Sequence, residues 1–532
     1  MKNQTIARGF PLTLTRIVCV SFVLFEASFC LAQETQGVKK NSQRPNILFI
    51  LTDQQRGDAV GCDGNPILQT PHLDRLAREG AMFSRAYSSV PSCKPARTTL
   101  LTSLNPWNHG SIGYAGPAEE YPREIVKMLR DEGYYCMGIG KMHFTPQQNL
   151  HGYHKILFDE SGRDGQDGGP KSRGFVSDYR KWFKEVAPGL NPDATIVGWS
   201  DGWNDHRQRY YALPTHLHPT AWTGDRAVEF VEEWDGEQPF FLKVSFARPH
   251  SPYDAPKEYC EFYEQNRDRM PGRIVGDWAE QNARRGEKFP GNLWRGDLGP
   301  KAPIDAKIGY YGSISFIDEQ VGRILEALEK KGQLDNTFIL MTSDHGDMMG
   351  DHHLWRKSYA YEGSARIPML IRWGKTIPTS APTNQRLPQL VELRDVGVTF
   401  LSVAGVPYDP EWFDGQNMMS LVLDNQAPWR QILDLEHANC YARENHWSAL
   451  TNGKMKYIFN AYSGAEQLFD LEKDPQELHD LSSDPAHAAE LQEWRERLIE
   501  HLAPRGEGFV KDGQLVYPRT PSQIGRNFPS PK

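Results

Sequence analysis

Short continuous apolar runs alternate along the chain with segments whose apolar residues recur at helical spacing. Residues 47–51 form an unbroken apolar run, which is typical of a strand buried on both faces of a parallel sheet. Similar runs predict strands within residues 134–140, 240–250, 337–343 and 366–373. Helical spacing predicts helices within residues 70–80, 124–132, 220–234 and 313–332. This alternation predicts an α/β fold with a large doubly wound, mixed or mostly parallel sheet flanked by helices.

Two segments interrupt the alternation, and the pattern changes near the C-terminus. Residues 146–215 and 264–305 are rich in Gly, Pro, Asp, Arg and Trp, which predicts large loops of the kind that shape substrate pockets. After residue 430, short strands with turns at Asn452-Gly453 and Ser463-Gly464 precede an amphipathic helix. We therefore expect a large α/β domain at 44–430 and a small α+β subdomain with an antiparallel sheet at 431–532.

The N-terminus has the pattern of a secretory signal peptide at 1–32. Lys2, Arg8 and Arg16 precede an apolar run at 17–31, and Ala32 offers a small residue for cleavage. The run is short for a membrane span, which needs about 20 apolar residues; an uncleaved anchor helix is the alternative. Residues 33–43 are polar and predict a linker. We expect an exported protein, periplasmic or secreted, with no membrane span after cleavage.

Composition narrows the classes of partner. The chain has 532 residues, 39% of them hydrophobic, which is enough for a large core. Its net charge of −8 argues against a general nucleic-acid-binding surface, so an anionic substrate would need a local basic pocket. Two of the seven cysteines lie in the signal segment, and the others are scattered without CxxC spacing. This spacing predicts neither a disulfide framework nor a zinc finger.

Polar side chains follow the predicted strands, at the sheet edge where open α/β sheets bind ligands. Asp53 and Gln54 follow the first strand, and Asp344 and His345 follow a later one. A single carboxylate at a strand end can also serve as a turn or helix cap. Together, however, an oxygen-rich set with one imidazole suits a hard divalent cation such as Ca²⁺, Mg²⁺ or Mn²⁺ better than zinc.

Four basic residues follow strands or lie downstream of them: Lys141, His143, His250 and Lys357. They would make the same cleft locally positive. A metal ion and several cations in one pocket suit an anionic ester, because the metal polarises one oxygen and the cations neutralise the remaining charge.

A lone cysteine, Cys93, lies at the start of a helix-like segment rather than inside an apolar element. With Pro95 and Arg97 it forms a Cys-x-Pro-x-Arg pattern. This pattern resembles the maturation signature of type I, formylglycine-dependent sulfatases, which belong to the alkaline phosphatase superfamily. Four further stretches resemble sulfatase motifs in the family's order, at residues 133–144, 246–259, 342–372 and 466–481.

The resemblance implies how the nucleophile and the metal site are built. Cys93 would be converted to formylglycine by a formylglycine-generating maturation enzyme, and the hydrated aldehyde would supply the nucleophilic hydroxyl. Asp53, Gln54, Asp344 and His345 would bind the metal, Ca²⁺ in most relatives. The formylglycine at position 93 would be a further metal ligand.

The resemblance also implies roles for the remaining basic residues. Arg97 would hold the formylglycine in place, and Lys141 would contact both it and the sulfate. His143 would deprotonate the second hydroxyl of the geminal diol. His250 and Lys357 would bind the sulfate, with His250 helping to protonate the leaving oxygen.

Some positions depart from the usual sulfatase pattern. Asp53-Gln54 replaces the Asp-Asp of many members, Asp344-His345 replaces the Asp-Asn of some, and Thr102-Ser103 replaces the usual Thr-Gly. Asp-Gln together with Asp-His also occurs in relatives that cleave phosphonate monoesters and phosphodiesters.

The resemblance implies an exported hydrolase of sulfate monoesters, most simply one that acts on sulfated small molecules or carbohydrates. The aromatic- and arginine-rich stretches 200–211 and 292–299 suit sugar stacking, although tryptophans also anchor ordinary loops. Two alternatives stay open: a phosphonate monoester or phosphodiester hydrolase on the same scaffold, and a non-catalytic protein that binds sulfated glycans.

Overall fold

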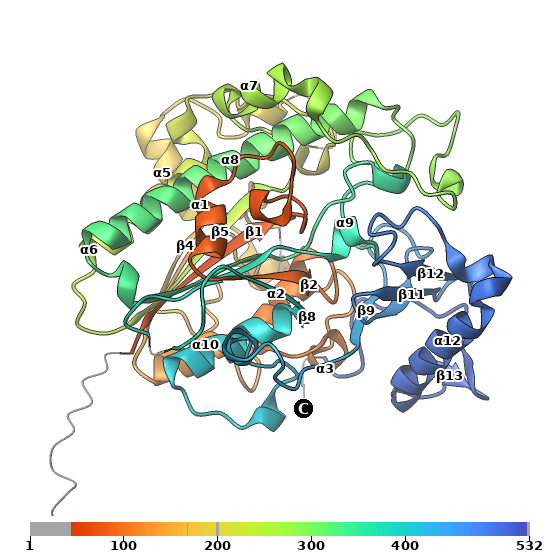
Figure 1. Ribbon diagram of the computed structural model, residues 1–532. Helices are drawn as coiled ribbons and strands as arrows, with labels where there is room; N and C mark the ends of the chain where they lie inside the picture. Colours follow the sequence, from red (N-terminus) through yellow and green to blue (C-terminus); the bar gives the residue numbers. More distant parts are fainter. Residues whose placement is uncertain (1–43, 167–168, 198–201, 378, 529–532) are drawn as a thin grey trace, which may run out of the picture. The chain divides into compact units, whose positions relative to one another are not determined.

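An eight-stranded sheet lies at the centre of the α/β part of the chain (Figure 1). The structure is a computed structural model that describes residues 44–528 except 167–168, 198–201 and 378. The strand order is β4-β3-β5-β1-β6-β7-β2-β8. Strand β7 pairs antiparallel with both neighbours, whereas the other pairs are parallel. The strands are β1 (Asn46–Asp53), β2 (Ala81–Tyr87), β3 (Tyr135–Gly140), β4 (Lys155–Phe158), β5 (Phe240–Pro249), β6 (Thr337–Ser343), β7 (Met369–Arg372) and β8 (Gln385–Glu392).

Helices cover both faces of this sheet, above and below it in Figure 1. One layer contains α1 (Pro71–Arg78), α6 (Pro219–Glu233) and α8 (Lys301–Lys330), with α7 (Lys257–Gln265) against α8. The other contains α2 (Cys93–Thr102), α4 (Ile125–Asp131) and α10 (Leu393–Ala404). Alternate residues of β1 pack into different cores, Leu48 and Ile50 with α8, and Phe49 with Phe400 of α10. The unbroken apolar run at 47–51 therefore reflects burial on both faces.

The predicted fold class is confirmed, but two local predictions were wrong. The segment 146–215 is not all loop, because it contains β4 at the edge of the sheet and α5 (Asp178–Val186). Strand β4 has only four residues, one of them exposed, which is too short for a clear period of two. The predicted loop 264–305 overlaps the start of α8 at Lys301. Three short helices complete this part: α3 (Pro106–His109), α9 (Glu362–Ala365) and α11 (Met419–Leu423).

A second, antiparallel sheet follows in the C-terminal part, as predicted. Its order is β12-β11-β10-β9, and its strands are β9 (Leu433–His437), β10 (Trp447–Thr451), β11 (Met455–Asn460) and β12 (Glu466–Asp470). Helix α12 (Ala488–Leu502) packs on one face, and β13 (Val510–Lys511) and β14 (Gln514–Leu515) form a small hairpin. The other face shares a core with Tyr87 and Leu390 of the large sheet. The boundary near residue 430 stays a prediction.

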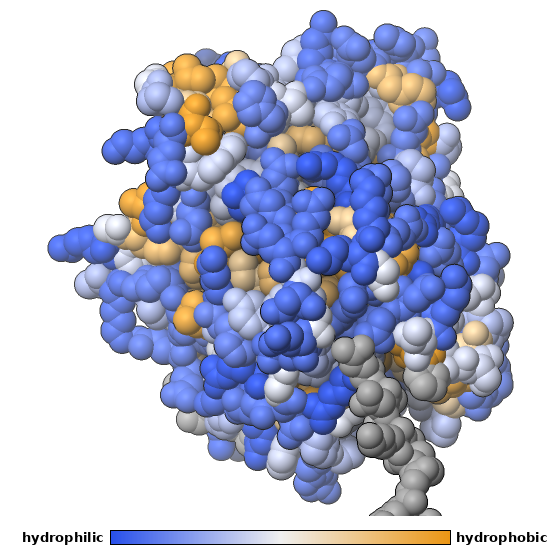
Figure 2. Space-filling view, turned by 90° about the vertical axis from the view of Figure 1, so that its left-hand side faces the viewer, coloured by the Kyte–Doolittle hydropathy of each residue, from blue (hydrophilic) through white to orange (hydrophobic). Residues whose placement is uncertain are grey.

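The predicted signal peptide at 1–32 and linker at 33–43 lie outside the described residues. Among the helices that the structure describes, none combines the length and the apolar character needed to cross a bilayer. The face shown in Figure 2 is mostly hydrophilic, with separate hydrophobic patches. The cysteines in the described part of the chain are all free thiols.

Candidate active site

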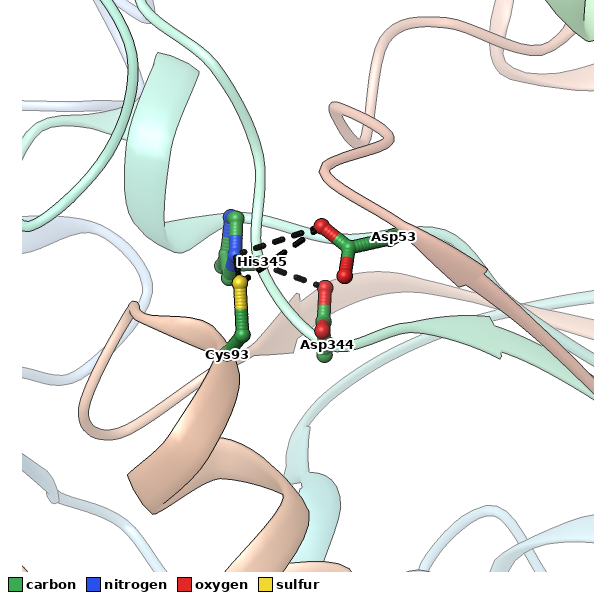
Figure 3. A group of neighbouring side chains, drawn as sticks. All are labelled: Asp53, Cys93, Asp344 and His345. Atoms are coloured by element: carbon green, nitrogen blue, oxygen red, sulfur yellow. Dashed lines mark hydrogen bonds and ion pairs between the residues drawn. The ribbon is translucent and has the colours of Figure 1, made fainter. Parts of the chain in front are cut away.

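Four side chains converge at the carboxyl ends of β1 and β6: Asp53, Cys93, Asp344 and His345 (Figure 3). Their potential ligand atoms all lie within 4.8 Å of one another, and all four residues are buried. Because β1 and β6 are parallel neighbours, the residues that end β1 and follow β6 meet at the same edge. The first residue of α2 supplies the sulfur from the opposite side.

Each carboxylate of this cluster has one oxygen paired with a cation. The Oδ2 of Asp53 lies 2.6 Å from Lys141 Nζ and 3.2 Å from Arg97 Nη2. The Oδ2 of Asp344 lies 2.9 Å from Arg97 Nε. The Oδ1 atoms lie 3.8 Å (Asp53) and 3.5 Å (Asp344) from Nε2 of His345. One oxygen of each carboxylate is thus charge-compensated, while the other lies near the imidazole at a common centre.

The hydrogen bond of His345 determines which nitrogen is available to a ligand. Its Nδ1 lies 2.9 Å from the carbonyl oxygen of Gly346, which only accepts. Nδ1 therefore carries a proton, and Nε2 is the nitrogen that faces the two Asp Oδ1 atoms and that a metal ion would bind. A second hydrogen bond of this kind is typical of histidines that bind metals.

Gln54 lies next to the same centre, and its amide is held from both ends. Its Oε1 accepts from Lys357 Nζ at 3.0 Å, and its Nε2 donates to Asp347 Oδ2 at 2.5 Å. Its φ of 73° is unusual for a residue other than glycine and indicates that the local structure enforces this orientation. Two carboxylates, an amide oxygen and one imidazole nitrogen are donors that fit an oxygen-preferring divalent cation, and the identity of the ion stays a prediction.

The Cys93 thiol is the first side chain of α2 and lies between cations and the carboxylates. Its Sγ lies 3.0 Å from Lys357 Nζ, 3.2 Å from His345 Nε2 and 3.6 Å from Asp53 Oδ1. Burial and Asp53 raise the pKa of the thiol, but Lys357, Lys141 and His345 offset this and hold the pKa well below its ordinary value. The site therefore stabilises an anion at position 93, as a helix N-terminus also does.

The two remaining predicted histidines, His250 and His143, are both buried. His250 Nδ1 donates to the carbonyl oxygen of Ser251 at 2.6 Å, which leaves Nε2 as its acceptor. Burial and the charge of Lys357 hold the pKa of His250 well below its ordinary value. An anion bound beside it would favour its protonated form. The ring of His143 lies edge-on to Tyr114, with centroids 6.4 Å apart.

Sequence reasoning missed two carboxylates that position these groups. Asp347 accepts from Gln54 and from the Tyr253 hydroxyl. Glu160, which follows β4, accepts from the backbone N–H groups of Met142 and His143, both at 3.1 Å. His143 has a φ of 61°, so its backbone needs such support. Asp347 follows the predicted metal segment closely enough to have been considered, whereas nothing in the sequence links Glu160 to residue 143.

We expect Glu160→Ala to lower kcat by about 10–100-fold with little change in KM, because His143 loses its positioning rather than its chemistry. Steady-state kinetics on a sulfate ester measures kcat and KM separately. Glu160→Gln is the matched control, since its Oε1 still accepts both N–H groups, and it should keep kcat within about threefold of the wild type. A Glu160→Ala enzyme with unchanged kcat would remove Glu160 from the positioning of His143.

Known proteins resemble this chain over most of its length. The family model described as Sulfatase matches residues 45–406, and the model described as N-sulphoglucosamine sulphohydrolase, C-terminal, matches residues 350–503. An arylsulfatase of Clostridium perfringens is 37% identical over 480 residues, which cover 89% of this chain and 97% of that protein. A choline-sulfatase of Rhizobium meliloti is 30% identical over 441 residues, 81% of each chain.

Among solved structures, the phosphonate monoester hydrolase of Agrobacterium radiobacter has a similar fold. Its TM-score is 0.69 at 24% sequence identity, and the match covers 90% of this chain and 100% of that one. This likeness supports the α/β architecture described above.

Proposed function

The chain belongs to the sulfatase family of the alkaline phosphatase superfamily, and from this premise we propose that it is an exported enzyme that hydrolyses sulfate monoesters of carbohydrates. The proposed nucleophile is a hydrated formylglycine made from Cys93. The observation that carries the proposal is the position of Cys93 at the N-terminus of α2, 3.0 Å from Lys357 Nζ and beside the cluster of Asp and His ligands.

Asp53, Gln54, Asp344 and His345 would hold the metal, together with the group at position 93. Ca²⁺ is the proposed ion, with Mg²⁺ or Mn²⁺ as alternatives, because most of the donors are oxygens. When bound, such a cation acidifies a hydroxyl that contacts it and stabilises negative charge on the sulfate.

Once the enzyme is matured, the proposed hydrolysis consumes only water. Maturation is a separate two-electron oxidation of the Cys93 Cβ: the maturation enzyme supplies the oxidant, the C–S bond breaks, the sulfur leaves as sulfide, and the aldehyde that forms adds water to give a geminal diol. One diol oxygen bonds to the ester sulfur while the bond from sulfur to the alcohol oxygen breaks, and the alcohol leaves with a proton. The second hydroxyl then loses its proton, the C=O bond re-forms, and sulfate leaves.

The basic residues of the site fit these steps. Lys141 and Lys357 are the proposed groups that neutralise the sulfate oxygens, and Arg97 holds both carboxylates by charged hydrogen bonds. His143 is the proposed base for the second hydroxyl. His250, whose Nε2 becomes a donor once the sulfate favours its protonation, is the proposed donor to the leaving oxygen.

Support for a carbohydrate substrate and for export comes from different parts of the chain. The model that matches residues 350–503 carries the name of an enzyme acting on N-sulphoglucosamine. The charged and apolar pattern of residues 1–32 supports export.

Matched esters test the proposed reaction. We expect kcat/KM for p-nitrophenyl sulfate to exceed that for p-nitrophenyl phenylphosphonate and bis-p-nitrophenyl phosphate by at least about 100-fold, because a site that hydrogen-bonds three terminal oxygens rejects analogues with fewer. Steady-state kinetics with Ca²⁺ present measures the ratios. A ratio below one would favour a phosphonate monoester or phosphodiester hydrolase. The observation that favours this alternative is the combination of Asp53-Gln54 with Asp344-His345.

A further inference from the structure

A cavity of about 420 Å³ lies between the C-terminal sheet and two loops of the α/β part. Its walls come from three stretches that are far apart in the sequence, within residues 278–295, 354–361 and 444–480. The volume falls in the range of small-ligand pockets, about 300–1,000 Å³. None of its lining residues belongs to the cluster around Cys93, and the reaction proposed above makes no use of it.

Aromatic side chains form rigid walls of this cavity. Trp278 and Tyr361 stack with centroids 4.6 Å apart and an interplanar angle of 25°. The Tyr359 hydroxyl donates to the carbonyl oxygen of Trp294 at 2.7 Å, and both residues line the cavity. Such fixed, amphipathic rings suit a ligand that presents apolar C–H groups beside polar ones, as a sugar ring does.

Two amide side chains in the wall each have bonding capacity left for a ligand. Asn445 donates through Nδ2 to the carbonyl oxygen of Ser358, and Gln467 accepts through Oε1 from the Tyr361 hydroxyl. Within the described residues, Oδ1 of Asn445 and Nε2 of Gln467 have no hydrogen-bond partner in the protein. One acceptor and one donor therefore remain for hydroxyl groups of a ligand.

The charges that line the cavity are opposite to those of the cleft at Cys93. Glu444, Glu466 and Asp480 line the cavity together with Arg295. Arg495 neutralises Glu466, because it contacts both carboxylate oxygens at 2.7 Å, so Glu444 and Asp480 remain against the one guanidinium of Arg295. This surplus of negative charge disfavours a sulfate group, whereas it accepts hydrogen bonds from neutral hydroxyls. A sulfated group is accordingly directed to the cationic cleft and an uncharged one to the cavity.

The cavity wall continues directly from the lysine that contacts Cys93. Lys357 Nζ lies 3.0 Å from Cys93 Sγ, and Tyr359, two residues further along, already lines the cavity. Two residues of extended chain span at most about 7 Å. The carbonyl oxygen of the intervening Ser358 accepts from Asn445 and from Trp447 Nε1, both at 3.0 Å, which fixes this segment against the C-terminal sheet.

We propose that this cavity binds an unsulfated sugar unit of a glycan whose sulfated unit lies at Cys93. The inference rests on the proposed sulfatase function and makes it more specific: the substrate is an oligosaccharide or polysaccharide rather than an aryl or monosaccharide sulfate.

Filling the cavity tests the inference. Ala465 is exposed and lines the cavity, so Ala465→Trp blocks it without disturbing the core. Ala489→Trp is the matched control, because Ala489 is exposed on α12, against the opposite face of the same sheet. The probes are p-nitrophenyl sulfate and a panel of sulfated chondroitin, heparan and carrageenan oligosaccharides of increasing length. Gln467→Met repeats the test without added volume if the first variant does not fold.

We expect Ala465→Trp to raise KM for the hydrolysed oligosaccharides by at least about tenfold, while kcat/KM for p-nitrophenyl sulfate stays within about twofold. Ala489→Trp should match the wild type on both probes. Unchanged oligosaccharide kinetics in Ala465→Trp would overturn the inference, as would wild-type enzyme that cleaves p-nitrophenyl sulfate and none of the oligosaccharides. Matured enzyme that cleaves no sulfate ester at all would instead count against the proposed function.

Discussion

Cys93→Ala is expected to lower kcat for sulfate-ester hydrolysis by about 10⁴–10⁶-fold, the range seen when a covalent nucleophile is removed. Alanine offers neither a thiol for maturation nor a hydroxyl for attack, whereas the proposed metal ligands Asp53, Asp344 and His345 are unchanged. Steady-state kinetics measures the loss. The mass of the tryptic peptide Ala86–Arg97 from wild-type protein, made in its native host, shows whether an aldehyde or its hydrate replaces the thiol. Lys94 precedes Pro95, so this peptide should remain whole.

Two further variants separate the formylglycine mechanism from simpler ones. Cys93→Ser keeps a hydroxyl but cannot form a geminal diol, so we expect it to retain sulfate as a stable ester after at most one turnover. Cys62→Ala is the control for thiol removal elsewhere, at a partly buried position after β1 outside the site, and should keep wild-type activity. An unmodified thiol in active, natively made protein would rule out the formylglycine mechanism. An unmodified thiol in inactive protein would point to failed maturation or to the glycan-binding alternative.

Arg97→Met is expected to destabilise the metal-free protein by about 3–5 kcal/mol, because it leaves two buried carboxylates without their shared cation. The Arg97 side chain is fully buried and pairs with Asp53 and with Asp344. It also donates to the Lys141 carbonyl oxygen at 2.6 Å, so its loss removes contacts to Asp53, to Asp344 and to the backbone of Lys141. Urea unfolding in the presence of a chelator measures the change in free energy.

The same measurement with Ca²⁺ in excess distinguishes charge compensation from packing. A bound divalent cation would neutralise the carboxylates in place of the guanidinium, so we expect a smaller loss of stability than in chelator. Arg97→Lys keeps the positive charge but not the planar guanidinium with its several N–H donors. Its loss of stability should therefore lie between that of Arg97→Met and the wild type. An equal loss for Arg97→Met in both conditions would show that Arg97 acts through packing rather than through its charge.

Local pattern in the sequence was sufficient for the main elements and for most of the site. The apolar run at 47–51 indicated a strand buried on both faces, because only such a strand lacks polar alternation. The polar residues that follow it, and those that follow β6, could be grouped in advance because parallel strands end at one edge of a sheet. The Cys-x-Pro-x-Arg pattern placed Cys93 at a helix start, where the structure has it.

Tertiary structure alone decided how those residues are oriented and what supports them. Which oxygen of Asp53 is paired with Lys141, and which nitrogen of His345 is available, follow from contacts between distant segments. Glu160 reaches the backbone of His143 only because the edge strand β4, too short to recognise by its period, places it there.

The cavity beside Tyr359 likewise could not be predicted from the sequence alone. It joins stretches within residues 278–295, 354–361 and 444–480, and each alone has the composition of an ordinary loop or hairpin. The sequence determined the fold class and the chemistry available at the strand ends, since both depend on local pattern. The folded chain determined orientation, support and the second binding space, since these depend on contacts between residues far apart in the sequence.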